Sequence, residues 1–271
     1  MRGEKRIINA QMALHEKEFK KAVKQRKYMK QHSESVLELL DILIERTRAA
    51  APKRCKDYCL SRPPGLDKVK DDSERHLEQA IFKRWNRKVV QATVRPFQGA
   101  LCHHIQTFQM PLKEHRDDKA WGMIDLVGVS GLGLPVVIEL KTAEATDNPL
   151  SMLVQGLAYA VALQEAWNEG DLCRRWMSCQ SQEFDAPVRL ERVPVVGIAP
   201  IAYWKRKLGQ VGKSPAGKVP ETAWEPFRSL CKACSDWGFP IEFLEFEVRG
   251  SDSEGLPIVG DPVPVRGIET A

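Results

Sequence analysis

The sequence predicts an α/β fold in which helices flank a central mixed β-sheet, preceded by a helical extension. Residues 72–201 show hydrophobic patterns in the order helix, three strands, helix, strand, which is typical of an α/β sandwich. A Gly-rich stretch, SGLG, joins two of these strands and is suited to a hairpin turn. The chain has 271 residues, of which 43% are hydrophobic and 28% charged, so it is long enough to bury a sizeable core.

Hydropathy and charge narrow the classes of protein. No stretch approaches the roughly 18 apolar residues of a membrane span, and MRGEKRIINA lacks the apolar core of a signal peptide. We therefore expect a soluble, cytoplasmic protein with no membrane partner. Lys and Arg number 41 against 36 Asp and Glu, and residues 1–50 hold the whole excess of +5. This basicity permits a nucleic-acid partner without requiring one.

Residues 1–50 are predicted to form a basic helical extension. HEKEFKKAVKQRKYMK has a narrow apolar stripe among many lysines, and SVLELLDILIERTRAA has the pattern of a stronger amphipathic helix. The lysines form either a solvated helix face or an arm along a phosphate backbone. These helices could equally bind a protein partner or a second copy of the chain. Residues 51–71, which contain Pro-Pro-Gly, are predicted to be a linker.

The main domain is predicted to span residues 72–250 and to begin with a helix and three strands. SERHLEQAIFKRW has helical periodicity, with Asp72 or Ser73 as its N-terminal cap. VVQATVRPF is predicted to be a strand from its β-branched alternation. GMIDLVGV and LPVVIEL are predicted to be the two strands of the hairpin.

The second half of the domain continues with a helix over TDNPLSMLVQGLAYAVALQEAW, in which Pro149 suits the first helical position. VPVVGIAPI is apolar enough for a strand buried on both faces. A basic loop, KRKLGQVGKSPAGKVP, is expected next, followed by a short helix near TAWEPFRSLCKACSDW and a last strand, IEFLEFEVR. Residues 251–271 are predicted to be a loosely ordered, Pro-rich tail.

The hairpin is predicted to bring two acids and one amine together. If SGLG turns near Leu132, antiparallel partners have numbers that sum to about 264, so Asp125 lies opposite Glu139. Lys141 falls on the same face as Glu139 because side chains alternate along a strand. Opposed carboxylates repel each other, and a divalent cation would remove that penalty. Carboxylates and water suit Mg²⁺ or Mn²⁺.

The alternative is a solvated surface ion pair, which is a common arrangement. Against it, both Asp125 and Glu139 lie within apolar runs, and burying ions costs several kcal/mol unless they are compensated. We therefore favour the metal site.

Gly122-x-x-Asp125 followed by Glu139-x-Lys141, within this order of elements, resembles the PD-(D/E)XK superfamily of nucleases and phosphodiesterases. Ile124 stands where the proline of the motif would be. The resemblance covers roughly residues 72–204. It implies a restriction-endonuclease-like core and metal-dependent hydrolysis of phosphodiester bonds, most often in DNA, with Mg²⁺ or Mn²⁺ held by Asp125 and Glu139. A catalytically silent nucleic-acid-binding or structural module with the same fold is the alternative.

Two further features resemble RecB-type and lambda-exonuclease-like members of that superfamily. Gln155-x-x-x-Tyr159 places two side chains on one helix face, and the resemblance implies that they lie near the active site and contact DNA. A core-packed Tyr beside an incidental Gln is the alternative. Family members also often place an acid on the first helix near the metal. Glu74 and Glu78 both fit that position, and the sequence does not choose between them.

Basic and aromatic residues follow the fourth strand and form a candidate nucleic-acid-binding wall. Cations hold phosphates and aromatic rings stack on bases, although solubility explains the same residues equally well. The candidates are Tyr203, Trp204, Lys205, Arg206 and Lys207.

The seven cysteines include two close pairs, Cys55 with Cys59 and Cys231 with Cys234. Four thiolates could hold zinc or an iron–sulfur cluster. However, three residues separate the first pair, and neither pair lies in a Gly-bearing knuckle. Free, packed thiols are therefore the favoured interpretation, with a cysteine-held metal as the alternative.

Overall fold

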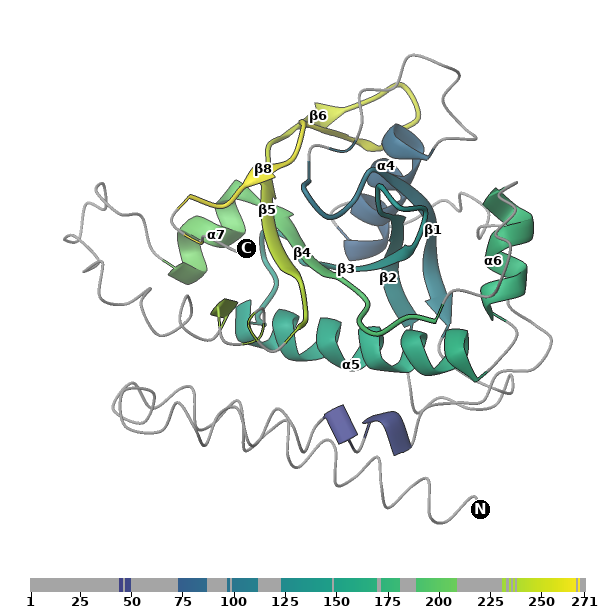
Figure 1. Cartoon of the computed structure of the whole chain (residues 1–271). Coiled ribbons are helices and arrows are strands. Elements are labelled where there is room, and N and C mark those ends of the chain that lie inside the picture. The colour runs from purple at the N-terminus through teal and green to yellow at the C-terminus, as the bar shows by residue number, and fades with distance from the viewer. Residues whose placement is uncertain are drawn as a thin grey trace, which may run out of the picture.

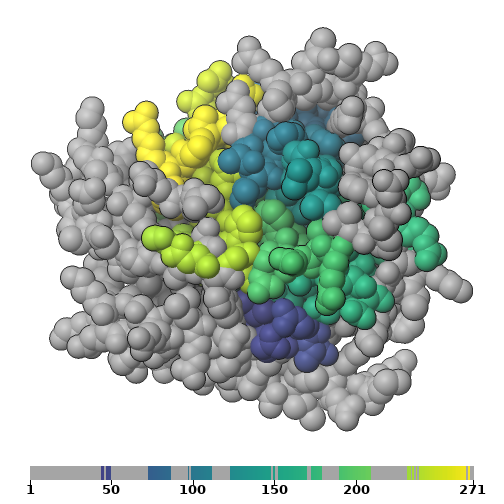
Figure 2. All heavy atoms as spheres, in the orientation of Figure 1, coloured from purple at the N-terminus to yellow at the C-terminus, as the bar shows by residue number. Residues whose placement is uncertain are grey.

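The computed structural model describes residues 44–49, 73–86, 97–111, 123–169, 172–180, 189–208, 231–266 and 268, except 46, 98, 148, 233, 235 and 237. The helix predicted before residue 44, the predicted linker 51–71 and most of the predicted strand 89–97 lie outside these residues. Residues 44, 45 and 47–49 are helical, within a predicted helix. Ile44 is buried in the core cluster that contains α5, and Arg48 donates a hydrogen bond to Glu165 at 3.2 Å. Figure 2 shows this segment, in purple, next to the green part of the chain.

A six-stranded mixed sheet forms the centre of the fold (Figure 1). The spatial order is β1-β2-β3-β4-β5-β8. The first three strands are antiparallel, β3, β4 and β5 are parallel, and β8 pairs antiparallel with β5, so the predicted α/β class and mixed sheet are confirmed. The strands are β1 His104–Pro111, β2 Met123–Val129, β3 Pro135–Leu140, β4 Val195–Pro200, β5 Ile241–Phe246 and β8 Val263–Pro264.

Helices cover both faces of this sheet (Figure 1). Alternate residues of β3 divide between two cores: Ile138 packs with α4, and Val137 packs with α5 and α6. No helix in the described parts of the chain is long and apolar enough to cross a bilayer. The helices are α4 Glu74–Trp85, α5 Pro149–Asn168, α6 Leu172–Gln180 and α7 Ile201–Leu208.

Two helix starts agree with the sequence. Ser73 is the N-cap of α4, and its hydroxyl accepts a hydrogen bond from the backbone N–H of His76 at 3.2 Å. α5 begins at Pro149, whose missing N–H costs nothing at the first helical position. Both starts matter for function, because α4 and α5 carry the acids and amides described below.

The strand that precedes β2 is not the predicted one. β1 runs over HIQTFQMP, and Phe97, the described residue of the predicted strand, is not in a strand. The sequence of β1 does not alternate clearly between polar and apolar residues. Most of its side chains are buried, including the polar Gln106 and Thr107. The strand is also irregular, with a register shift between Ile105 and Thr107 and a positive φ of 51° at Gln109.

The predictions for the C-terminal third need two corrections. Residues 251–264 of the predicted tail are not loose, because β6 Val248–Ser251 pairs with β7 Pro257–Val259 and β8 then extends the main sheet. Lys83 of α4 forms an ion pair with Asp252 at 3.2 Å, which fastens this hairpin to the core. The predicted basic loop begins as helix, since Lys205 to Leu208 complete α7.

Gly156 allows α5 to lie close to the sheet. A Cβ atom at this position would be 2.5 Å from Cγ1 of Val195 on β4. We expect Gly156→Ala to reduce the free energy of unfolding by about 1–3 kcal/mol, measured by urea denaturation. Val195→Ala removes the clashing atom, so the double variant should be less destabilised than the sum of the two single variants. Strict additivity would contradict this packing.

Candidate active site

The β2–β3 hairpin has the predicted register. Leu126 pairs with Ile138 and Val127 with Val137, so partner numbers sum to 264. The next position along that register sets Asp125 opposite Glu139. Both side chains are buried, and Asp125 Oδ2 accepts a hydrogen bond from the backbone N–H of Leu140 at 2.9 Å. Apolar neighbours along both strands therefore force two carboxyl groups together inside the protein.

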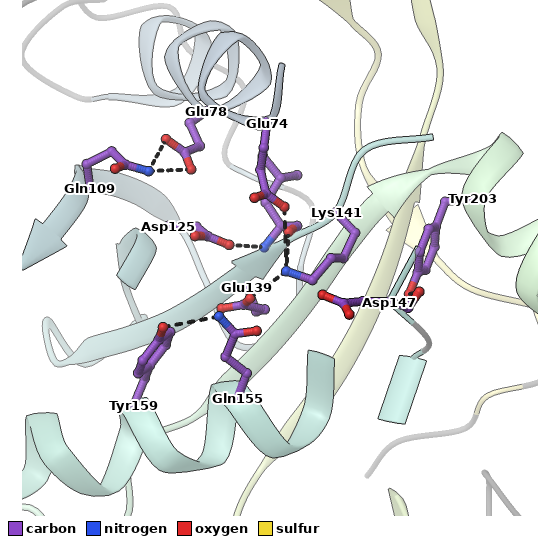
Figure 3. Close-up of polar contacts among 11 residues, drawn as sticks. Glu74, Glu78, Gln109, Asp125, Glu139, Lys141, Asp147, Gln155, Tyr159 and Tyr203 are labelled. Carbon is purple, nitrogen blue, oxygen red and sulfur yellow. Dashed lines mark hydrogen bonds and ion pairs between the residues drawn. The ribbon is translucent and has the colours of Figure 1, made fainter. Parts of the chain in front are cut away.

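Lys141 lies directly beside these acids (Figure 3). Its Nζ donates to Glu139 Oε1 at 2.6 Å and to the carbonyl oxygen of Leu140 at 3.0 Å. It also lies 3.5 Å from Glu74 Oε1 on α4. The side chain of Glu139 is fully buried and that of Glu74 is 42% exposed. The ammonium therefore links the sheet to α4 at the point where the cluster reaches solvent.

The two candidate acids of α4 have different partners. Glu74 faces Lys141, whereas Glu78 is 1% exposed and both its oxygens accept from Gln109 Nε2 at 2.6 Å (Figure 3). Gln109 was not predicted as a site residue, because β1 was not identified as a strand from the sequence. Its flanking residues pair with the neighbours of Asp125, so it lies opposite Asp125 on β1, and its positive φ turns it out of the regular pleat. Glu74 is thus the α4 acid that joins the Asp125–Glu139–Lys141 cluster.

The electrostatics of the cluster follow from burial. Burial, and then the neighbouring carboxylates, raise the pKa of Asp125 to about 7 and that of Glu78 to about 8. The pKa of Glu139 is raised well above its usual range for the same reasons. Burial disfavours the charge on Lys141, but Glu139, Asp125 and Glu74 outweigh it and raise its pKa. The lysine is therefore a fixed cation at neutral pH, and the acids are short of positive charge.

The donor set fits a small, hard divalent cation. Glu139 Oε2 is buried and receives no hydrogen bond, and the adjacent Asp125 carboxylate is another acceptor unless it carries a proton. Mg²⁺ commonly takes one or two carboxylates and completes its shell with water and substrate phosphate. Within the described residues, no three His, Cys, Asp or Glu side chains form a metal-binding group by themselves. The fit therefore depends on two carboxylates and on ligands from solvent or substrate.

Gln155 and Tyr159 share one face of α5 on the side of the cluster (Figure 3). Gln155 Nε2 lies 3.1 Å from the Tyr159 hydroxyl oxygen and donates to it. Burial, and then the charge of Glu139, raise the pKa of Tyr159 to about 12, so the phenol stays protonated. The tyrosine ring also packs against the core, which agrees with the alternative that Tyr159 is a core residue beside an incidental Gln. Its hydroxyl nevertheless lies within the electrostatic reach of Glu139.

The predicted nucleic-acid wall needs a correction. Tyr203 is 0% and Trp204 2% exposed, because their rings anchor α7 to the core. The Tyr203 hydroxyl donates to the Asp147 carbonyl at 3.1 Å, and Trp204 Nε1 donates to the Leu244 carbonyl at 3.0 Å. These rings cannot stack on bases in this arrangement.

The three cations of α7 lie on its outer side. Arg206 binds Glu144 at 2.9 Å, and Lys207 donates to the Thr146 carbonyl at 2.7 Å. Arg206 and Lys207 thus hold the loop between β3 and α5. Lys205 is exposed and lines the cavity described further below.

Cys231 and Cys234 are buried in the core against α5. Burial raises the pKa of both, so they are protonated thiols at neutral pH. Cys55 and Cys59 lie outside the described residues.

Comparison with protein-family models, with curated proteins and with solved structures gives no match. The geometry of the cluster is therefore the basis for a functional assignment.

Proposed function

We propose that this protein is a metal-dependent nuclease of the PD-(D/E)XK type, which hydrolyses phosphodiester bonds in DNA. One observation carries the proposal. Asp125 and Glu139 are buried side by side with Lys141, and one Glu139 oxygen lacks any donor. Burying ionised carboxyl groups costs several kcal/mol unless they are compensated, and a bound cation would add to the compensation that Lys141 provides.

The residues take distinct roles. Asp125 and Glu139 would hold Mg²⁺ or Mn²⁺, and Glu74 lies close enough to Lys141 to complete the acidic rim. An ion held there would supply positive charge for the scissile phosphate and an activated water for the attack. Lys141 is held protonated, so it acts as a fixed cation that stabilises negative charge on the phosphoryl oxygens.

Gln155 and Tyr159 supply hydrogen-bond donors from α5 for the same phosphate or its neighbour. The tyrosine hydroxyl keeps its proton at neutral pH, as a donor to an anion requires. The exposed side of Glu74 marks the side from which substrate reaches the buried acids.

A catalytically silent nucleic-acid-binding module with the same fold is the second candidate. The observation in its favour is the ion pair between Lys141 and Glu139, which already neutralises part of the cluster without a metal. Calorimetric titration with Mg²⁺ and Mn²⁺ separates the two candidates, because a silent module need not bind either ion.

The direct test is cleavage by the full chain. Labelled single-stranded, double-stranded and circular DNA and a matched RNA are incubated with Mg²⁺, with Mn²⁺ or with EDTA. We expect cleavage of DNA that requires the divalent ion. Failure to cut any of these substrates with either ion would contradict the proposal.

A further inference from the structure

A cavity of about 630 Å³ opens at the carboxyl ends of β3, β4 and β5. Two segments that line the cavity adjoin residues of the acidic cluster in the sequence. Thr142, on its wall, directly follows Lys141, and His76 and Leu77 lie on α4 between Glu74 and Glu78. Ligands of open α/β sheets commonly bind outside the carboxyl ends of parallel strands. The cavity is therefore well placed to hold the part of a substrate that flanks the reacting bond.

The walls combine apolar surfaces with a charged rim. Ile201, Val248 and Pro257 present apolar surface to the cavity, and Val248 is 44% exposed, whereas Leu77, Phe246 and His76 are nearly buried beneath it. Flat apolar and aromatic surfaces bind the faces of nucleobases. Lys205 and Arg249 are exposed on the same lining, Arg249 in an ion pair with Glu247. Cations in this position can follow a phosphate backbone out of the cavity.

The size of the cavity restricts what can enter. Ligand-binding cavities of about 300–1,000 Å³ hold small molecules the size of one nucleotide. A base inside a duplex is stacked and paired, so it can enter only after it has been unpaired. A cavity of this size would therefore admit a base of single-stranded DNA but not a base within a duplex.

We infer that this cavity receives one unpaired nucleotide of the substrate, next to the phosphate that lies at the Asp125–Glu139–Lys141 cluster. This rests on the proposed function and narrows its substrate class to single-stranded DNA or frayed ends. The base lies against Ile201, Val248 and Pro257, and the adjoining phosphates face Lys205 and Arg249.

The test fills the cavity without touching the cluster. Ala202 lines the cavity and is exposed, so Ala202→Trp blocks the space without burying a new side chain in the core. Ala100 is also exposed and lies outside the cavity, so Ala100→Trp is the matched control. Affinity for a fluorescent ten-residue oligothymidylate is measured by anisotropy in the Asp125→Asn chain, which keeps binding separate from cleavage. Cleavage kinetics are measured in the otherwise unchanged chain with Mg²⁺.

We expect Ala202→Trp to weaken oligothymidylate binding by about 5- to 100-fold, the range for loss of one stacked base, and to raise KM with a smaller effect on kcat. Ala100→Trp should change neither by more than about twofold. A blunt duplex should bind equally to both variants.

If the unchanged chain cuts DNA but Ala202→Trp leaves affinity and KM unaltered, the cavity assignment is overturned and the nuclease stands. If Ala202→Trp weakens oligothymidylate binding and Ala100→Trp does not, but no substrate is cut, the cavity assignment stands and the proposed nuclease activity is wrong.

Discussion

Asp125→Asn should reduce Mg²⁺-dependent DNA cleavage by at least about 100-fold, while the protein folds normally. Asparagine has the size of aspartate and retains an oxygen that accepts the Leu140 N–H. It loses the negative charge that would attract the cation. It removes attraction to Lys141, but it also removes repulsion with Glu139 and Glu78 and the cost of burying a charge, which together raise the pKa of Asp125 to about 7, so we do not expect the fold to weaken. The measurement is the initial rate of cleavage, with circular dichroism as the check on folding.

Glu242→Gln is the matched control for this variant. Glu242 is also a buried carboxylate on the central sheet, but it accepts hydrogen bonds from Ala100 and Leu101 at 2.8 and 3.1 Å and has no contact with the cluster. We expect its cleavage rate to stay within about threefold of the unchanged chain. Equal activity of Asp125→Asn and the unchanged chain would rule out the assigned metal site.

Substitution of Lys141 would test the site less directly, because it would change both activity and stability. Its Nζ contacts Glu139 and Glu74, so removing it leaves a fully buried carboxylate without its cation. Breaking a buried pair in this way typically costs about 3–5 kcal/mol of stability. Loss of activity in Lys141→Met would therefore combine lost chemistry with lost stability, which is why the neutral, isosteric change at Asp125 is more informative.

The hairpin was predictable because its register depends on local rules. A Gly-rich turn fixes the pairing, and apolar alternation fixes the face, so Asp125, Glu139 and Lys141 could be brought together from the sequence. The contacts from α4 could be predicted only in part. The family resemblance implied an acid on this helix, and helical spacing placed Glu74 and Glu78 on one face. The choice between them depends on how α4 crosses the sheet, which local patterns do not encode.

Three other features depend on long-range packing. Gln109 lies on an irregular strand with a positive φ, and neither property has a sequence signal at a glutamine. Tyr203 and Trp204 stand beside three cations in the sequence, yet α7 turns the rings inward and the cations outward. The C-terminal strands are short and Pro-bearing, and β8 is held by pairing with β5 rather than by its own propensity.

The stability of the metal-free protein should fall as the pH rises from about 4.5 to 8. Glu78 has its usual pKa of about 4.5 in the unfolded chain and a pKa of about 8 in the folded one. Between these values the folded state binds more protons than the unfolded state, so each rise in pH favours unfolding. Below this window the stabilising effect of the proton is complete, and above it the effect is lost. The difference corresponds to several kcal/mol, on the order of 4–5.

Two variants divide this window. Glu78→Gln keeps an acceptor for Gln109 and cannot ionise, so it should make the decline shallower from about pH 4.5 to 8, and most clearly between pH 7 and 8, above the pKa of Asp125. Asp125→Asn should make the decline shallower only below about pH 7, because the pKa of Asp125 rises from 3.8 to about 7 on folding. Melting temperatures in EDTA at pH 5, 6, 7 and 8 test both expectations. A melting temperature that is flat or rises across this range in the unchanged chain would show that the carboxyl groups are not strained by burial.

Magnesium should reverse the decline, because an ion that binds only the folded state stabilises it by mass action. The effect should be largest at pH 8, where the acids are ionised and their repulsion is strongest, and smallest at pH 5, where protons compete with the ion. Asp125→Asn should lose most of this stabilisation while melting higher than the unchanged chain in EDTA at pH 8. A variant that is more stable without metal and inactive with it would show that the cluster's electrostatic strain serves metal binding and not the fold.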